Sequence, residues 1–143
     1  MTLILIQCAA FWFMAGVTWT LQILNYPLLE KINSSTFASY QEAHNKRFGK
    51  VMIPGVMISV LSTILLFFNL PDEVSFTIPL VQTVILLLIT GSAALYAAPA
   101  HKKLEKNFDQ VPVSSLIMTN WLRLIAWLVL GIGDLYLLGE LGF

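Results

Sequence analysis

Four long apolar runs constrain this chain more than any other feature of its sequence. They cover residues 3–29, 51–70, 76–98 and 113–138. A helix needs about 20 mostly apolar residues to cross the hydrocarbon core of a bilayer. Because lipid offers no partner for backbone N–H and C=O groups, such runs are expected to be helices. We therefore predict an all-α, four-transmembrane-helix bundle, with residues 1–143 forming a single integral membrane domain.

The composition supports a lipid environment. Hydrophobic residues make up 57% of the chain and charged residues 11%, against about 45–50% and about 25% in soluble domains. The formal net charge is zero, and there is no basic stripe, which argues against nucleic acid as a partner. No Lys or Arg precedes the first apolar run, so we predict a retained helix and not a cleaved signal peptide.

The segment before the second span, residues 30–50, is amphipathic. It offers N-cap candidates in Asn33, Ser34 and Ser35. Aromatic residues and a histidine then recur at helical spacing, at Phe37, Tyr40, His44 and Phe48. We expect a helix that either lies at the membrane interface or extends the second span, and Pro54-Gly55 should kink such a long helix.

Basic residues occur in alternate loops. The loop after the first span holds four of them and the loop after the third holds three, namely Lys31, Lys46, Arg47, Lys50, Lys102, Lys103 and Lys106. Cytoplasmic loops of membrane proteins carry the excess of Lys and Arg. We therefore predict that these two loops face the cytoplasm of a bacterial inner membrane, with both termini on the non-cytoplasmic side.

Arg123 lies inside the fourth apolar run. An arginine near the middle of a membrane helix costs about 2.5–3.5 kcal/mol on insertion scales, so its side chain should face the bundle interior or a wet cavity. Asn120, three residues earlier, shares the same helix face. Two interpretations stay open: Arg123 joins helices by bonding to carbonyl groups or to Asn25, or it belongs to a functional site.

The predicted topology brings further polar residues to the membrane face with the basic loops. The expected ligand-binding residues are Asn25, Tyr26, Arg47, Asn120 and Arg123, with Gln22 at a similar depth. The opposite half holds Gln7, Gln82, Asp134 and a few hydroxyl groups. Asp134 is expected near the outer interface and hydrated, with a proton relay as the alternative. This asymmetry predicts a polar site at the cytoplasmic half.

Two histidines on different helices, His44 and His101, complete this group. They could be axial ligands of a haem, or they could transfer protons, since histidine titrates near neutral pH. A third interpretation leaves both solvated and inert. The catalytic candidates are therefore His44, His101 and Arg123; the two histidines are metal ligands only if haem is present, and a site without a cofactor is equally consistent with the sequence.

Small residues indicate where helices approach closely. Gly91, Ser92, Gly131 and Gly133 lie within the third and fourth spans. Small side chains let membrane helices pack with their backbones near one another. We expect these positions to lie at helix contacts.

The spaced pattern NYP…F..Y…H..R…P over residues 25–54, P.H..L at 99–104 and NW.R..AW at 120–127 covers most of the chain. It resembles a family of small, mostly uncharacterised bacterial four-helix membrane proteins. More distantly, the architecture is similar to the anthrone-oxygenase-like (DUF1772) group, which is linked in part to oxidation of aromatic polyketides. That resemblance implies an oxidoreductase acting on a lipophilic substrate. Four-span porphyrinogen oxidases are a further comparison, but this chain lacks their histidine in the first helix.

Three functions follow from these observations. The first is a membrane enzyme or binding protein for a lipophilic small molecule. The second is a non-catalytic accessory or scaffold subunit of a membrane complex. The third is a transporter or channel, which four spans could form only as an oligomer. The expected partners are membrane lipids, a lipophilic small molecule, and a homo-oligomer or larger membrane complex.

Overall fold

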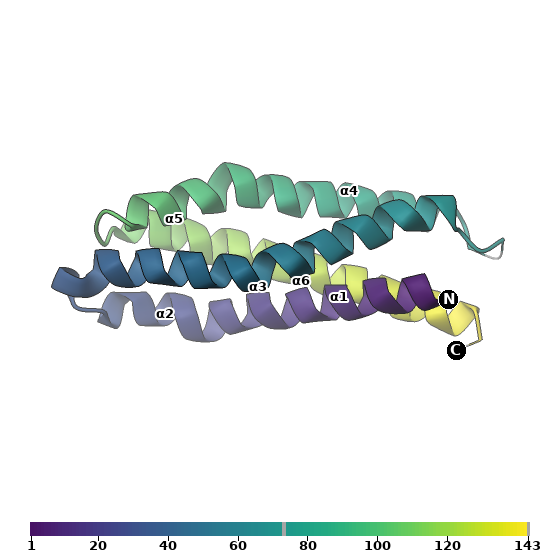
Figure 1. Cartoon of the computed structure of the whole chain (residues 1–143), viewed down its shortest axis with the longest axis horizontal. Coiled ribbons are helices and arrows are strands. Elements are labelled where there is room, and N and C mark those ends of the chain that lie inside the picture. Colours follow the sequence, from purple (N-terminus) through teal and green to yellow (C-terminus); the bar gives the residue numbers. More distant parts are fainter. Residues whose placement is uncertain (73, 143) are drawn as a thin grey trace.

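The computed structural model describes residues 1–72 and 74–142. Four helical segments in this part of the chain are long and apolar enough to cross a membrane: Thr2–Lys31, Ser34–Phe68, Thr77–Leu104 and Gln110–Glu140. They form an elongated bundle (Figure 1). The outer surface is rich in large apolar side chains, including Phe68 at 81% and Leu88 at 67% exposure. The predicted four-span bundle is confirmed, and the chain is a multi-pass membrane protein.

Two of the four segments contain a π-helical interruption. The elements in chain order are α1 (Thr2–Thr20), a π-helical segment (Leu21–Asn25), α2 (Tyr26–Leu28), a 3₁₀ turn (Leu29–Lys31), α3 (Ser34–Phe68), α4 (Thr77–Ser92), a second π-helical segment (Ala93–Ala97), α5 (Ala98–Leu104) and α6 (Gln110–Glu140).

The amphipathic segment is the first part of α3, so of the two predicted placements the extension of the second span is correct. Asn33 caps the helix, and its Oδ1 accepts a hydrogen bond from the Ser35 backbone N–H at 3.0 Å. Pro54 lies inside α3 without ending it. Asp109 caps α6 in the same way, through the Val111 N–H at 3.0 Å. Short polar side chains at these positions satisfy N–H groups that have no partner within the helix.

Both termini lie at one end of the bundle, beside the turn between α3 and α4 (Figure 1). The other end carries the connections after α2 and after α5. The lysines of the chain and Arg47 lie in or next to these connections, and we call this end the basic end. The first span packs most extensively against α6 and α3. Three apolar clusters fill the interior, centred on Leu116 at the basic end, Trp127 in the middle and Leu137 at the termini end.

Close helix contacts occur at only some of the predicted small residues. A Cβ added to Gly131 would lie 2.9 Å from the Trp12 ring, so α1 and α6 approach closely there. Gly91 has nothing within 4 Å of such a Cβ, so its predicted role in packing is wrong. Gly55, which the sequence did not single out, would place a Cβ 2.5 Å from Met14 Sδ. α1 and α3 therefore approach closely at Gly55.

A buried group of polar residues lies towards the termini end, with one side chain from each span: Gln7, Thr63, Gln82 and Asp134. We call it the polar tetrad. Gln7 Nε2 donates to Thr63 Oγ1 at 2.7 Å, and Gln82 Nε2 donates to Asp134 Oδ1 at 2.7 Å. Asp134 is 0% exposed. The expectation that Asp134 is hydrated at the interface is wrong, because the four helices enclose it.

Candidate functional site

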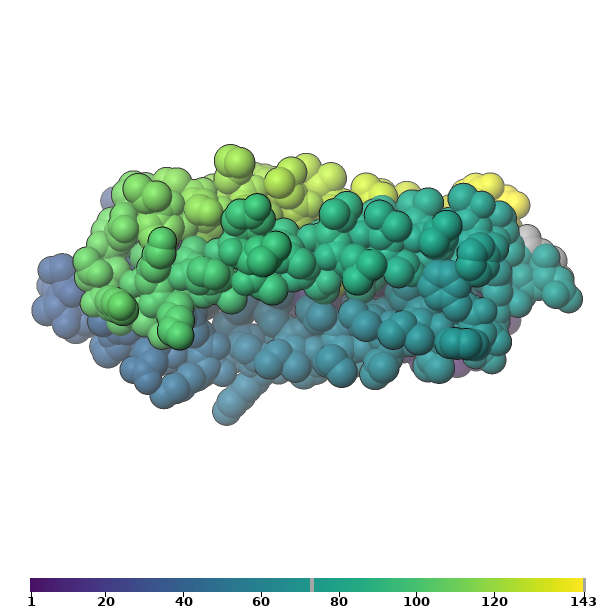
Figure 2. Space-filling model, turned by 90° about the horizontal axis from the view of Figure 1, so that it is seen from above, coloured from purple at the N-terminus to yellow at the C-terminus, as the bar shows by residue number. Residues whose placement is uncertain are grey.

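A cavity of about 610 Å³ lies between α3 and the third span, near the basic end. Figure 2 shows the face on which these two segments lie side by side. Ligand pockets in proteins commonly enclose about 300–1,000 Å³ and are mostly apolar with a few polar groups. Apolar side chains line most of this cavity, and its polar lining residues are Tyr26, Asn45, His101, Asn120 and Arg123.

Arg123 is the most unusual group in the cavity. Its side chain is 6% exposed, and its Nε is buried without a hydrogen-bond partner. In the described part of the chain the only ion pair joins Lys46 to Glu42, so no described carboxylate compensates Arg123. Tyr26, 1% exposed, is the neighbouring side chain that interacts with the guanidinium. The cavity therefore contains a cation without a counter-ion among the described residues.

Asn120 shares the inner face of α6 with Arg123, as the spacing predicted. Its Nδ2 donates to the Thr18 backbone carbonyl and to Gln22 Oε1, both at 2.9 Å. Its Oδ1 is buried with no partner among the described residues. The two donated bonds fix the amide, and its Oδ1 is an acceptor without a described partner in a residue that lines the cavity.

His101 lines the same cavity from α5. Gln41 Nε2 donates to its Nδ1 at 3.0 Å. Since an amide nitrogen only donates, Nδ1 accepts, and a neutral ring then carries its proton on Nε2. The Tyr26 ring lies 6.4 Å from the imidazole, centroid to centroid. His101 is thus oriented by a buried amide, and its Nε2 makes no hydrogen bond to a described residue.

The amide of Gln41 belongs to a chain of polar contacts that runs along the cavity through Asn45 to Glu105. Gln41 Nε2 also lies 3.0 Å from Asn45 Oδ1, and Asn45 Nδ2 donates to Glu105 Oε1 at 2.8 Å. Gln41, Asn45 and Glu105 were not among the residues predicted for the site. A signal was present, because Phe37, Gln41 and Asn45 are spaced four residues apart on one face of α3.

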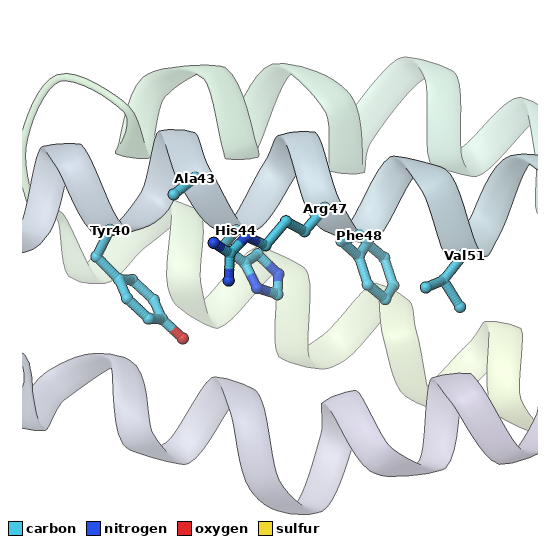
Figure 3. Close-up of a pocket in the computed structure, with 6 residues that line it drawn as sticks. All are labelled: Tyr40, Ala43, His44, Arg47, Phe48 and Val51. Atoms are coloured by element: carbon cyan, nitrogen blue, oxygen red, sulfur yellow. The ribbon is translucent and has the colours of Figure 1, made fainter.

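His44 occupies a different position from His101. Its ring stacks between Tyr40 and Phe48, with centroids 6.0 Å and 5.4 Å away. Asn25 Nδ2 lies 3.3 Å from its Nδ1. Tyr40, His44, Phe48 and Arg47 line a shallow pocket of about 380 Å³ along α3 (Figure 3). His44, Arg47 and Asn25 therefore lie near the cavity of Arg123 but do not line it.

The arrangement does not fit a haem held by both histidines. Their ring centroids are 6.4 Å apart, but the cavity lined by His101 does not include His44. A metal-bound histidine donates its second ring N–H to an acceptor. Here the Nδ1 of each histidine instead faces an amide nitrogen, on Gln41 and on Asn25.

The two π-helical segments, Leu21–Asn25 and Ala93–Ala97, both border this cavity. Each is followed two residues later by a proline, Pro27 and Pro99. Proline removes a backbone N–H donor and clashes with the preceding turn, and short π-helical segments inside α-helices are frequent at functional sites. The two prolines thus coincide with widened turns that help to shape the cavity wall.

Of the predicted site residues, the cavity brings together Tyr26, His101, Asn120 and Arg123. In comparisons with protein-family models, with curated proteins and with solved structures, nothing matches this chain.

Proposed function

We propose that this protein binds a lipophilic small molecule with an anionic or carbonyl-bearing headgroup in the cavity of Arg123. The observation that carries the proposal is the uncompensated guanidinium, 6% exposed and lining the cavity wall. Charged groups inside membrane helices normally pair with one another or mark a ligand pathway. A ligand anion or carbonyl oxygen would supply the missing partner.

The polar lining favours a particular kind of headgroup. The planar guanidinium offers parallel N–H donors that match a carboxylate or another planar oxygen pair. His101 Nε2 and the Tyr26 hydroxyl add further polar contacts, while Asn120 Oδ1 is an acceptor. The rest of the wall is apolar and suits a hydrocarbon or aromatic body, with Leu21, Met52, Val56 and Ala97 among its residues.

The position of the cavity favours access from the bilayer. Its wall includes Ile53 and Met57 of α3, which are 64% and 51% exposed on the outer surface. On the facing third span the lining residues apart from His101 are small, namely Ala93, Ala94, Ala97 and Ala98. Small side chains leave room between the helices at the level of the cavity. A ligand dissolved in lipid could therefore reach Arg123 without crossing the aqueous phase.

If the bound molecule reacts, His101 and Tyr26 are the groups placed to hold or move a proton. The resemblance to the anthrone-oxygenase-like group supports oxidation as the reaction class. The distribution of lysines supports an orientation in which this half of the bundle, in a bacterial inner membrane, faces the cytoplasm.

The test is to purify the protein from membranes and identify co-purifying small molecules by mass spectrometry. We expect a bound lipophilic acid or carbonyl compound in the wild type and a loss of about tenfold or more in Arg123→Gln, since a hydrogen bond to a charged group contributes about 1.5–3 kcal/mol. Arg47→Gln is the matched control, because Arg47 is exposed and lies outside the cavity. Equal ligand in wild type and Arg123→Gln, or an empty wild type, would overturn the proposal.

A non-catalytic accessory subunit is the second candidate. It is favoured by Asn120, whose amide links α6 to the first span through Thr18 and Gln22. Under this function Arg123→Leu should leave the protein folded and change only its assembly with other membrane proteins. Co-purification of a stable partner that is lost in Arg123→Leu, without any bound small molecule, would favour the accessory subunit over the ligand site.

A further inference from the structure

The polar tetrad lies outside the proposed ligand site and has a separate chemistry. Its four members come from four different spans, and all are less than 5% exposed. Besides the two bonds of 2.7 Å, Gln7 Nε2 lies 3.5 Å from Gln82 Oε1. Thr63 Oγ1 in turn donates to the Ser59 carbonyl at 2.8 Å. The amides of Gln7 and Gln82 thus connect the four spans, and the buried carboxyl group of Asp134 ends the series.

No described cation balances that carboxyl group. The nearest basic residue along α6 is Arg123, eleven positions away, or about 16 Å along the helix. The polar groups that the other spans place around Asp134 carry no positive charge. They are the thiol of Cys8 on the first span, hydroxyl groups on the second span and the neutral Gln82 on the third span. The other described charged groups at this end, the Met1 amino group, Asp72 and Glu140, belong to exposed residues.

Two oxygen atoms of the tetrad are buried without a partner among the described residues: Asp134 Oδ2 and Gln7 Oε1. Both are acceptors when the carboxyl group is ionised, so neither can satisfy the other. An unpaired carboxylate in a membrane interior is strongly disfavoured, and the group neutralises instead. A proton on Oδ2 would remove the charge and turn one of the two acceptors into a donor.

We propose that the tetrad is a buried proton-binding site, in which Asp134 is a neutral carboxylic acid. Its Oδ1 accepts from Gln82, and its Oδ2–H is the donor available to the amide oxygen of Gln7. On the side of the termini the site is closed by Ile4, Leu66, Leu137 and Leu138, all at most 4% exposed. The bound proton is therefore shielded from water while the helices stay packed.

Infrared spectroscopy of the protein in lipid at neutral pH tests this site directly. We expect the C=O stretching band of a protonated carboxylic acid in the wild type and its loss in Asp134→Asn. Asp109→Asn is the control, because Asp109 is exposed at the N-terminus of α6; it should keep the band. Absence of the band in the wild type, or its persistence in Asp134→Asn, would overturn the proposal.

A stability measurement distinguishes the proton from a metal cation. A neutral amide mimics a neutral acid, so Asp134→Asn should unfold within a few degrees of the wild type. A cation-binding carboxylate would behave differently: sodium chloride, but not choline chloride, would raise the Tm of the wild type alone. That result, or failure of Asp134→Asn to fold, would also overturn the proton site.

Discussion

Asn120 donates a hydrogen bond to the backbone carbonyl of Thr18 at 2.9 Å, across the contact between α6 and α1. The bond crosses 102 residues of sequence. It lies on the same face of α6 as Arg123, one turn away. The side chain that joins the two helices is therefore also part of the wall of the cavity of Arg123.

Replacing Asn120 should weaken this contact. Asn120→Leu removes the bonds to Thr18 and Gln22, and interhelical hydrogen bonds in membranes contribute about 0.6 kcal/mol on average, up to about 1.7 kcal/mol. We expect a loss of about 1 kcal/mol in the free energy of unfolding, measured by denaturant titration in mixed micelles. Thr119→Ala is the control, because the Thr119 hydroxyl bonds within its own helix at 2.8 Å. An equal loss of unfolding free energy in both variants would contradict a stabilising role for the Asn120 bonds between α6 and the first span.

Alanine should have opposite effects at two glycines. In Gly55→Ala the new methyl group would lie 2.5 Å from Met14 Sδ and 3.0 Å from the Phe13 ring, and overpacking costs about 1–3 kcal/mol. Gly91→Ala meets open space and gains helix propensity of up to about 1 kcal/mol. Thermal unfolding followed by size-exclusion chromatography should give a lower Tm for the first variant and an unchanged or higher Tm for the second. A tolerated Gly55→Ala would mean that α1 and α3 can move apart.

The two histidines should differ in their effect on ligand content. His101→Ala removes a polar group from the cavity wall, whereas His44 lies in the aromatic stack along α3. We expect less co-purified ligand in His101→Ala and unchanged content in His44→Ala. An absorption spectrum of the same samples checks the cofactor: a Soret band lost in both single variants would show a haem held by both histidines and contradict the geometry described here.

The accessibility of introduced cysteines should establish how the protein is oriented in the membrane. In a Cys8→Ser background, Lys106→Cys places a thiol in the loop after α5, and Asp72→Cys places one in the turn after α3; both original side chains are exposed. The charge distribution predicts that a membrane-impermeant maleimide applied to intact cells labels the second variant alone. Labelling of the first alone would reverse the proposed topology.

The four spans could be predicted from sequence because lipid imposes a length and a polarity on every crossing helix. The same reasoning brought Tyr26, His101, Asn120 and Arg123 to one membrane face. It did not separate them from Asn25, His44 and Arg47, since a topology gives depth but not the direction of a side chain around the helix axis. Gln41 and Asn45 were missed because their polarity resembles that of a solvated surface.

The number of spans, their approximate limits and the concentration of polar groups in one half of the bundle all follow from the order of residues along the chain. Which polar groups face each other depends on how the helices pack: Arg123 lies at a cavity without a described counter-ion, and Asp134 makes a closed contact with Gln82. Transfer into lipid depends on the composition of each segment separately, whereas the burial of Asp134 depends on how four helices are rotated against one another.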